Sequence, residues 1–435
     1  MPLKKECIYI FERIKKYLKG GGEAAFESEQ GSALGLWCEM YENRAPWLDS
    51  RTKSLNLAAA VASEYARLVT LELKTELTGS ARAEYLNAPY GDLVRRLRKS
   101  VEYGCAKGGL IFKPFVSRNG MHVECIQADA FVPTEFDSSG RLMGAVFAEQ
   151  IRRGKLTYTR LEQHGFEEGR YVIRNKAFVC GRAGTGLGSE LPLTDVPEWS
   201  LLLAELWLDG VERPLFAYFT PSSGNQEENR SPLGVSVFSK AVDLIKDADV
   251  QYSRLLWEFE GSELAVDAAS DVLKPMGEGS RLPKRSERLF RRLETADPDF
   301  YRVFSPAIRD QSIINGLNTI LRRIEFNCGL AYGTLSDVRT VQRTAQEILD
   351  SRQRSYASIC DCQRALRFAL EDLICAMDTL ATLYRLAPEG RVEAGFDFDD
   401  SIVTDRGTQF EERLKLVQNG ILAPEELKAW YLGKE

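Results

Sequence analysis

The sequence predicts an α+β protein that is mainly helical, with a β-meander in the middle of the chain. Apolar residues occur at helical spacing over 33–105 and again over 237–259, with charged residues between them. Residues 109–182 instead form short runs rich in β-branched and aromatic residues. The 435 residues exceed a single compact core, so two or more structural regions are expected.

The N-terminal part is predicted to be helical. A short amphipathic helix is expected to end at Gly20-Gly21-Gly22, and it lacks the apolar core and cleavage site of a signal peptide. Further helices are expected over 54–73 and 90–103, where apolar residues form continuous stripes. No apolar run approaches the roughly 18 residues of a membrane helix, so a protein made and kept in the cytoplasm is expected.

Turn signals divide the middle of the chain into strands. Asn119-Gly120, Ser139-Gly140 and Arg153-Gly154 separate the β-rich runs, which predicts an antiparallel meander. The glycine-rich segment 181–188 lacks the strand–loop–helix context of a nucleotide site, so we interpret it as a loop. The polar segment 221–234 is interpreted as a linker.

The second half is predicted to be mostly helical. Residues 266–306 mix short strand-like pieces with prolines and a basic run over 281–292, and a helix follows Pro306. Residues 338–387 then contain neither glycine nor proline, and one helix of that length would span about 75 Å. Such a helix must lie against neighbours, in an elongated subunit or an assembly. The polar stretch 351–358 leaves open a break in its middle.

The composition argues against several kinds of chemistry. A net charge of −6 is unlike a protein that wraps nucleic acid, although a channel that lets DNA slide is compatible with it. The nine cysteines include no CxxC pair, and neither His122 nor His164 has metal-ligand spacing, so no metal or cofactor is expected. The sequence contains no Walker loop, HExxH or GxSxG motif, and no enzymatic activity is expected.

One acidic cluster leaves a catalytic alternative open. Asp397, Asp399 and Asp400 could suggest a two-metal nuclease, because such sites need several carboxylates around Mg²⁺. The alternation of apolar and acidic residues around them favours an exposed strand.

A set of local sequences in fixed order carries a family resemblance. They are WCEMYENRAPW (37–47), SLNLAAAVASEYARLVTLEL (54–73), CAKGGLIFKPFV (105–116), IQADAFVPTEFDSSGRL (126–142), PLGVSVFSKAVDLIKDADVQYSRLLWEFEGSELAV (232–266), NCGLAYGTLSD (327–337), TAQEILDSRQRSY (344–356) and FDFDDSIVTDRGTQFEERLKLVQNGIL (396–422). Together they resemble the portal proteins of long-tailed bacteriophages, in particular the family typical of phages of Gram-positive hosts.

The resemblance implies a portal fold. Its expected regions are a wing (1–235, with helices over 33–105 and the meander over 109–182), a first stem helix (236–264), a clip (265–307), a second stem helix (308–328), a tunnel loop (329–337), a long wing helix (338–387) and a crown (388–435). Two glycines of this segment, Gly329 and Gly333, would let the tunnel loop bend as DNA moves.

The resemblance also implies a structural, non-enzymatic role in the virion. Portal subunits form a ring, with a dodecamer expected, at the unique capsid vertex, and the ring conducts double-stranded DNA during packaging and ejection. Expected partners are the terminase large subunit, a head-completion or adaptor protein, and the major capsid and scaffolding proteins. A minor capsid or head–tail connector protein of a phage-like particle is the alternative.

Two groups of site residues follow from the resemblance. The expected DNA-channel residues are Tyr332, Thr334, Leu335, Ser336, Arg339 and Arg343. The expected residues for partner docking at the clip are Lys284, Arg285, Arg288, Arg291 and Arg292, although a plain solvated surface remains the alternative for this basic run.

Overall fold

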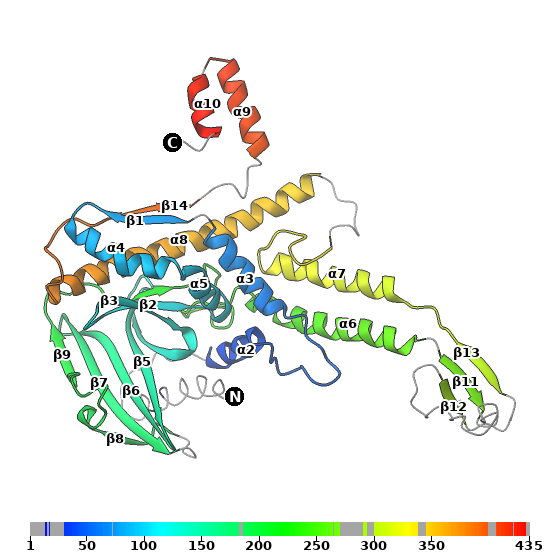
Figure 1. The fold of residues 1–435 in the computed structure, drawn as a ribbon, viewed down its shortest axis with the longest axis horizontal. Helices are drawn as coiled ribbons and strands as arrows, with labels where there is room; N and C mark the ends of the chain where they lie inside the picture. The colour runs from blue at the N-terminus through cyan, green and yellow to red at the C-terminus, as the bar shows by residue number, and fades with distance from the viewer. Residues whose placement is uncertain are drawn as a thin grey trace, which may run out of the picture.

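A computed structural model describes residues 14, 17, 30–71, 73–181, 186–263, 265–269, 290–293, 300–337, 345–398, 406–420 and 422–431. The α+β class is confirmed, with 42% helix and 25% strand. Figure 1 shows a mixed body of helices and sheets, a long helical hairpin that projects from it, and a shorter pair of helices near the C-terminus. None of the described helices has the length and apolar character needed to cross a bilayer.

The N-terminal helices of the body are α2 (Gly31–Tyr41), α3 (Leu57–Val69), α4 (Ala81–Val94) and α5 (Leu97–Lys107). Helix α3 buries the apolar stripe that the sequence predicted, including Val61, Ala62 and Val69. The expected helix before Gly20 falls outside the described residues except for Ile14 and Tyr17.

One strand interrupts the helices predicted over 33–105. Strand β1 (Lys74–Thr78) pairs antiparallel with β14 (Glu393–Asp397), with Leu77 opposite Ala394. The partner strand is more than 300 residues away in the chain. No local turn signal in the sequence could therefore predict this pair.

The antiparallel strands predicted over 109–182 are present, but they lie in two sheets and not in one meander, because the first two strands pair with a later strand. Strands β4 (Phe131–Phe136), β5 (Leu142–Arg153), β6 (Leu156–Glu167), β7 (Arg170–Gly181) and β8 (Ser189–Leu191) follow one another in a single sheet, where β9 (Glu205–Leu208) also pairs with β7. A second sheet has the order β10-β2-β3, formed by Ala217–Phe219, Leu110–Ser117 and Gly120–Gln127. Short 3₁₀ turns occur at Ala128–Ala130 and Leu193–Asp195. The segment predicted as a linker is irregular, but Asn225 anchors it through its amide nitrogen to Gln30 (2.8 Å) and to the Leu233 carbonyl (3.0 Å).

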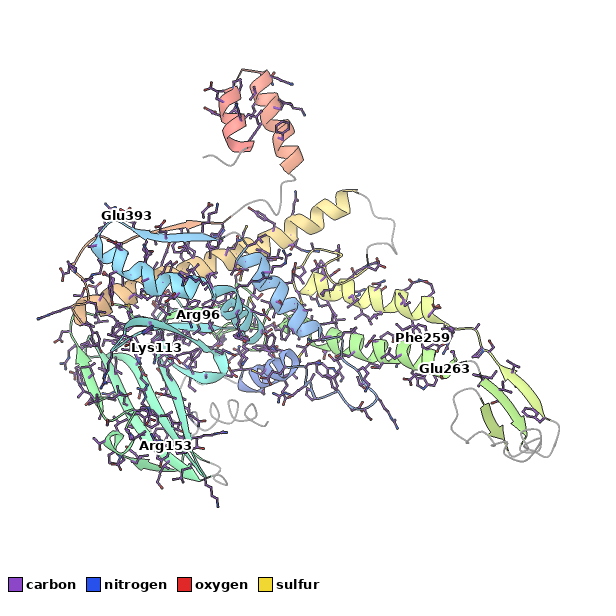
Figure 2. All side chains as sticks on the ribbon, in the orientation of Figure 1. Arg96, Lys113, Arg153, Phe259, Glu263 and Glu393 are labelled. Atoms are coloured by element: carbon purple, nitrogen blue, oxygen red, sulfur yellow. The ribbon has the colours of Figure 1, made fainter. Side chains whose placement is uncertain are left out.

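The projecting hairpin consists of α6 (Val242–Gly261) and α7 (Asp310–Asn327), which lie side by side (Figure 1). A 3₁₀ turn over Ser239–Ala241 precedes α6, so the helix begins later than the periodicity predicted. At its far end lies a small sheet of β11 (Ala265–Ala269), β12 (Phe290–Leu293) and β13 (Tyr301–Phe304), in the order β12-β11-β13. Figure 2 marks this end of α6 with Phe259 and Glu263.

The long helix α8 (Ala345–Leu383) crosses the body (Figure 1). Its 39 residues span about 58 Å and continue without interruption through 351–358, so the open question of a break there is answered. Ile359, Leu366, Leu370, Leu373 and Met377 are buried in the main core, as the apolar pattern predicted. The described chain ends with α9 (Arg406–Gln418) and α10 (Pro424–Tyr431).

Candidate functional site

The loop over 329–337 connects α7 to the segment that leads into α8. Residues of α3, α7 and α8 pack around it or bond to it. Gly329 has φ +68°, and a Cβ there would lie 2.7 Å from Ser358 Oγ of α8. The Tyr65 hydroxyl of α3 donates a hydrogen bond to the Cys328 carbonyl. Gly329 therefore serves a left-handed turn in close contact with its neighbours.

Glu325 closes this loop onto α7. Its side chain is fully buried, and Oε1 accepts hydrogen bonds from the backbone amides of Gly333 (3.0 Å), Leu335 (2.6 Å) and Ser336 (2.8 Å). Its Oε2 accepts a bond from Ser336 Oγ at 2.9 Å. Buried charge is tolerated where several donors surround it, so these bonds fix the loop in one conformation. Sequence reasoning missed Glu325, although an acidic residue just before a glycine-bracketed loop is a usable signal.

The expected channel residues occupy different places in this loop. Tyr332 and Leu335 are half-buried, and Thr334 is exposed. Ser336 is buried and bonded to Glu325, so its side chain is part of the internal support of the loop. Arg339 and Arg343 lie outside the described residues.

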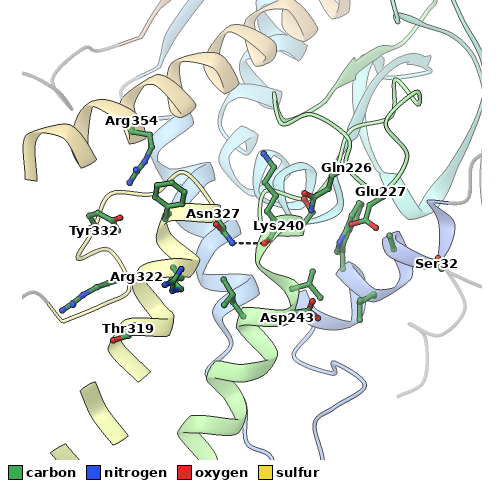
Figure 3. Close-up of a pocket in the computed structure, with 18 residues that line it drawn as sticks. Ser32, Gln226, Glu227, Lys240, Asp243, Thr319, Arg322, Asn327, Tyr332 and Arg354 are labelled. Carbon is green, nitrogen blue, oxygen red and sulfur yellow. Dashed lines mark hydrogen bonds between the residues drawn. The ribbon is translucent and has the colours of Figure 1, made fainter. Parts of the chain in front are cut away.

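A large groove lies beside the loop, where the hairpin joins α8 and α2. Its volume is about 1430 Å³, and Lys240, Arg322, Arg323, Phe326, Tyr332 and Arg354 define what we call the basic groove. Figure 3 shows Arg354 reaching from α8 toward the end of α7, near Tyr332. Asn327 donates a hydrogen bond to the Lys240 carbonyl (3.1 Å), which ties α7 to the start of α6.

Arg354 is the unusual residue of the basic groove. Its guanidinium carbon lies 4.3 Å from the centre of the Phe326 ring and 5.4 Å from that of Tyr332. Its Nε and Nη2 atoms are buried and have no hydrogen-bond partner within the described structure. Buried donors in proteins are normally paired, so this guanidinium can still accommodate an acceptor.

The groove carries a local excess of positive charge. Four of its lining residues are Lys or Arg and two, Glu227 and Asp243, are acidic, whereas the whole chain has a net charge of −6. The contributing elements are far apart in the sequence, and the basic groove was not predicted.

A buried polar cluster lies at a second pocket of about 1250 Å³, which is lined by residues of both sheets and of α2, α5 and α8. The His164 ring bonds to Glu162 Oε1 through Nε2 (2.7 Å) and to the Tyr171 hydroxyl through Nδ1 (2.7 Å). The ionised Glu162 carboxylate can only accept, so Nε2 of the neutral ring carries the proton and Nδ1 accepts from the Tyr171 hydroxyl, whose oxygen in turn accepts from the Leu215 amide at 3.0 Å. Lys113 Nζ lies 2.8 Å from Glu162 Oε2.

Burial and neighbouring charged groups shift the pKa values of Glu162 and His164 in this cluster. Burial alone would raise the pKa of the Glu162 carboxyl, but the charges of Lys113 and Arg160 and the His164 hydrogen bond hold it well below its usual range. Burial lowers the pKa of His164, against the opposite effect of Glu162. His164 is thus a hydrogen-bonded core residue, whereas His122 is exposed on β3.

The other expected sites are only partly described. Arg291 and Arg292 lie on β12, opposite Asp267 and Ala268 of β11, while Lys284, Arg285 and Arg288 lie outside the described residues. Asp397 ends β14 opposite Lys74, and Asp399 and Asp400 also lie outside. Within the described part of the chain, no three His, Cys, Asp or Glu side chains group as a metal site would require.

In comparisons with known proteins, no family model and no curated protein matches this chain.

Proposed function

We propose that this chain is the subunit of a portal ring, a structural protein without catalytic activity that conducts double-stranded DNA through a capsid vertex. The family resemblance of its collinear segments is the first support. The architecture is a second and independent support, because a projecting hairpin, an anchored loop and a long helix follow one another along the chain.

The order of these pieces is the observation that carries the proposal. In a ring, α6 and α7 correspond to the paired stem helices, and the β11–β13 sheet at their far end corresponds to the clip. Helix α8 then corresponds to the long wing helix, and the loop 329–337 to the tunnel loop. A helix of about 58 Å with a projecting hairpin suits a subunit that packs against copies of itself.

The DNA contacts in this proposal are few and do not depend on base sequence. Thr334 is exposed at the loop, with Tyr332 and Leu335 half-buried beside it, and we include Arg339 and Arg343 from the adjoining segment. Contacts to the phosphate backbone position a duplex without reading its sequence, which suits translocation. The docking partners at the clip are a terminase motor and a head-completion or adaptor protein, with Arg291 and Arg292 among the contact residues.

Electron microscopy of the purified protein tests the proposal. End-on views should show closed rings, with a dodecamer expected, around a hole wide enough for a duplex. Monomers in every salt condition would count against the ring and favour a minor capsid or connector protein. Mg²⁺-dependent cleavage of DNA by the purified chain would favour a nuclease and contradict the proposal of a structural protein.

A further inference from the structure

One side chain of the basic groove, Arg354, is only partly paired within the described structure. Two donor atoms of Arg354 are buried and unpaired in the described structure, while the ring of Phe326 stacks against the guanidinium. A guanidinium presents its donors as a planar fork, and the acceptors that match the fork are carboxylate and phosphate groups. An oxyanion is therefore the group whose chemistry matches this fork.

The size of the groove favours a protein segment over a small ion. Its volume of about 1430 Å³ is far larger than one carboxylate needs, and aromatic side chains from α7 and the 329–337 loop form part of its wall. A pocket with an apolar wall and a few converging cations is typical of protein–protein interfaces, where a side chain of the partner enters it.

We propose that the basic groove receives an acidic side chain from a second copy of this chain, and that Arg354 pairs with that carboxylate. The inference rests on the proposed ring function. Charge complementarity supports this occupant, because the groove is positive and the chain as a whole is acidic. The groove lies where the hairpin, the 329–337 loop and α8 meet. A side chain from a second copy that entered the groove would therefore contact the proposed stem, tunnel loop and long wing helix of one subunit.

The R354Q variant tests the pairing against a matched control, R364Q. Arg364 lies on the same helix, but it is exposed and paired with Asp361. We expect R354Q to raise the protein concentration for half-maximal ring assembly by about tenfold, and to weaken the salt dependence of assembly, because a charge-assisted contact is lost at each interface. R364Q should assemble like the wild type. Sedimentation velocity at several salt concentrations measures both effects.

The melting temperature of the unassembled subunit separates pairing from a structural role. Two Arg354 donors, Nε and Nη2, have no partner within the described structure, so R354Q loses mainly the stacking on Phe326 and should melt within about 3 °C of the wild type. A larger loss of melting temperature together with weaker assembly would assign Arg354 to the internal structure and overturn the proposal. Normal assembly of R354Q with reduced binding of duplex DNA would identify the oxyanion as phosphate and also overturn it.

Cross-linking identifies the partner carboxylate. The R354K variant, treated with a zero-length carbodiimide in rings mixed from ¹⁵N-labelled and unlabelled copies, should give peptides that join position 354 to an Asp or Glu of the other isotope. Links within one copy only would contradict the proposal. If the wild type forms no rings, the proposed ring function itself is contradicted. If it forms rings that R354Q leaves unchanged, only the pairing fails.

Discussion

Glu325 holds the 329–337 loop through backbone amides, so its replacement should act on that loop. In E325L the amides of Gly333, Leu335 and Ser336 lose their buried acceptor, whereas E325Q keeps one carbonyl oxygen for them. We expect E325L to lower the free energy of unfolding by about 2–4 kcal/mol and E325Q by less than about half of that. Urea denaturation followed by circular dichroism measures both variants.

Limited proteolysis shows which segment of E325L is destabilised. The first cleavage in E325L should fall within 329–337, because the loop opens before the rest of the body. A midpoint and cleavage pattern equal to those of the wild type would show that other contacts, such as that of Tyr65 with Cys328, are sufficient to hold the loop.

His164 makes stability depend on pH. Its folded pKa is lowered by burial, so the unfolded chain binds the proton more readily. The contribution of the neutral ring is therefore present above the unfolded pKa of about 6.5 and is lost as the pH falls below it. The expected slope is at most about 1.4 kcal/mol per pH unit, measured by urea denaturation between neutral and mildly acidic pH.

His122 provides the matched control, since the sequence contains only these two histidines. H164Q should flatten the dependence on pH below neutrality, while H122Q, changed at an exposed position, should keep the wild-type slope. Equal slopes in H164Q and the wild type would mean that other groups, such as the acidic side chains, produce the loss.

Elements were predictable from the sequence where their signal is local. The stripe with Val61 and Val69 predicts α3, and Asn119-Gly120 marks the turn between β2 and β3. The β1–β14 pair was missed because its partners are distant in the chain, and the tertiary pairing overrides the helical context of β1. The loop 329–337 was predicted as an interruption, but its anchor Glu325 was not, because its role depends on how the loop folds back.

The α6–α7 hairpin is closed near its far end by one ion pair. Glu258 accepts from Arg309 Nη2 at 2.8 Å, from Nε at 3.0 Å and from the backbone amide at 3.2 Å. The hydrogen bonds of Arg309 hold the pKa of the Glu258 carboxyl below its usual range. The contact is therefore present above the ordinary carboxyl pKa and is lost as the pH falls. We expect E258Q to speed amide hydrogen exchange in the first turn of α7.

The neighbouring exposed residue Glu260 gives the control for this pair. E260Q should leave exchange in α7 unchanged at neutral pH, and acidification should bring the wild type toward E258Q. Mass spectrometry of peptides that cover 309–316 resolves the effect. Equal exchange in E258Q and E260Q would show that the helix packing alone holds the start of α7.

At the scale of the molecule, the basic groove forms only when folding brings distant segments of the chain together. Lys240 precedes α6, Arg322 lies on α7 and Arg354 on α8, and no spacing in the sequence brings these three residues together. Periodicity predicts which face of each helix is buried, but it does not predict which helices meet. The basic groove therefore appears only in the folded chain, as does the buried cluster around His164.

The projecting hairpin exposes apolar side chains that a ring would cover. Trp257 is 66% exposed and Phe259 is 44% exposed, and both lie in the last turns of α6. Figure 2 labels Phe259 near the far end of the hairpin. Large exposed aromatic residues on an element far from the body are costly in water, and contact between hairpins of adjacent copies would bury them. We expect the fluorescence of Trp257 to shift to shorter wavelength when monomers assemble.

The difference between wild-type and W257F spectra isolates this residue from the other tryptophans, of which Trp37 and Trp199 are already buried in the single subunit. In monomers, the difference spectrum should show a solvent-exposed indole that acrylamide quenches readily, and in rings it should show a protected one. Rings with an unchanged, readily quenched Trp257 would mean that neighbouring hairpins are splayed apart. The subunits would then be held by the body alone, and the contacts around α8 and the basic groove would account for the whole interface.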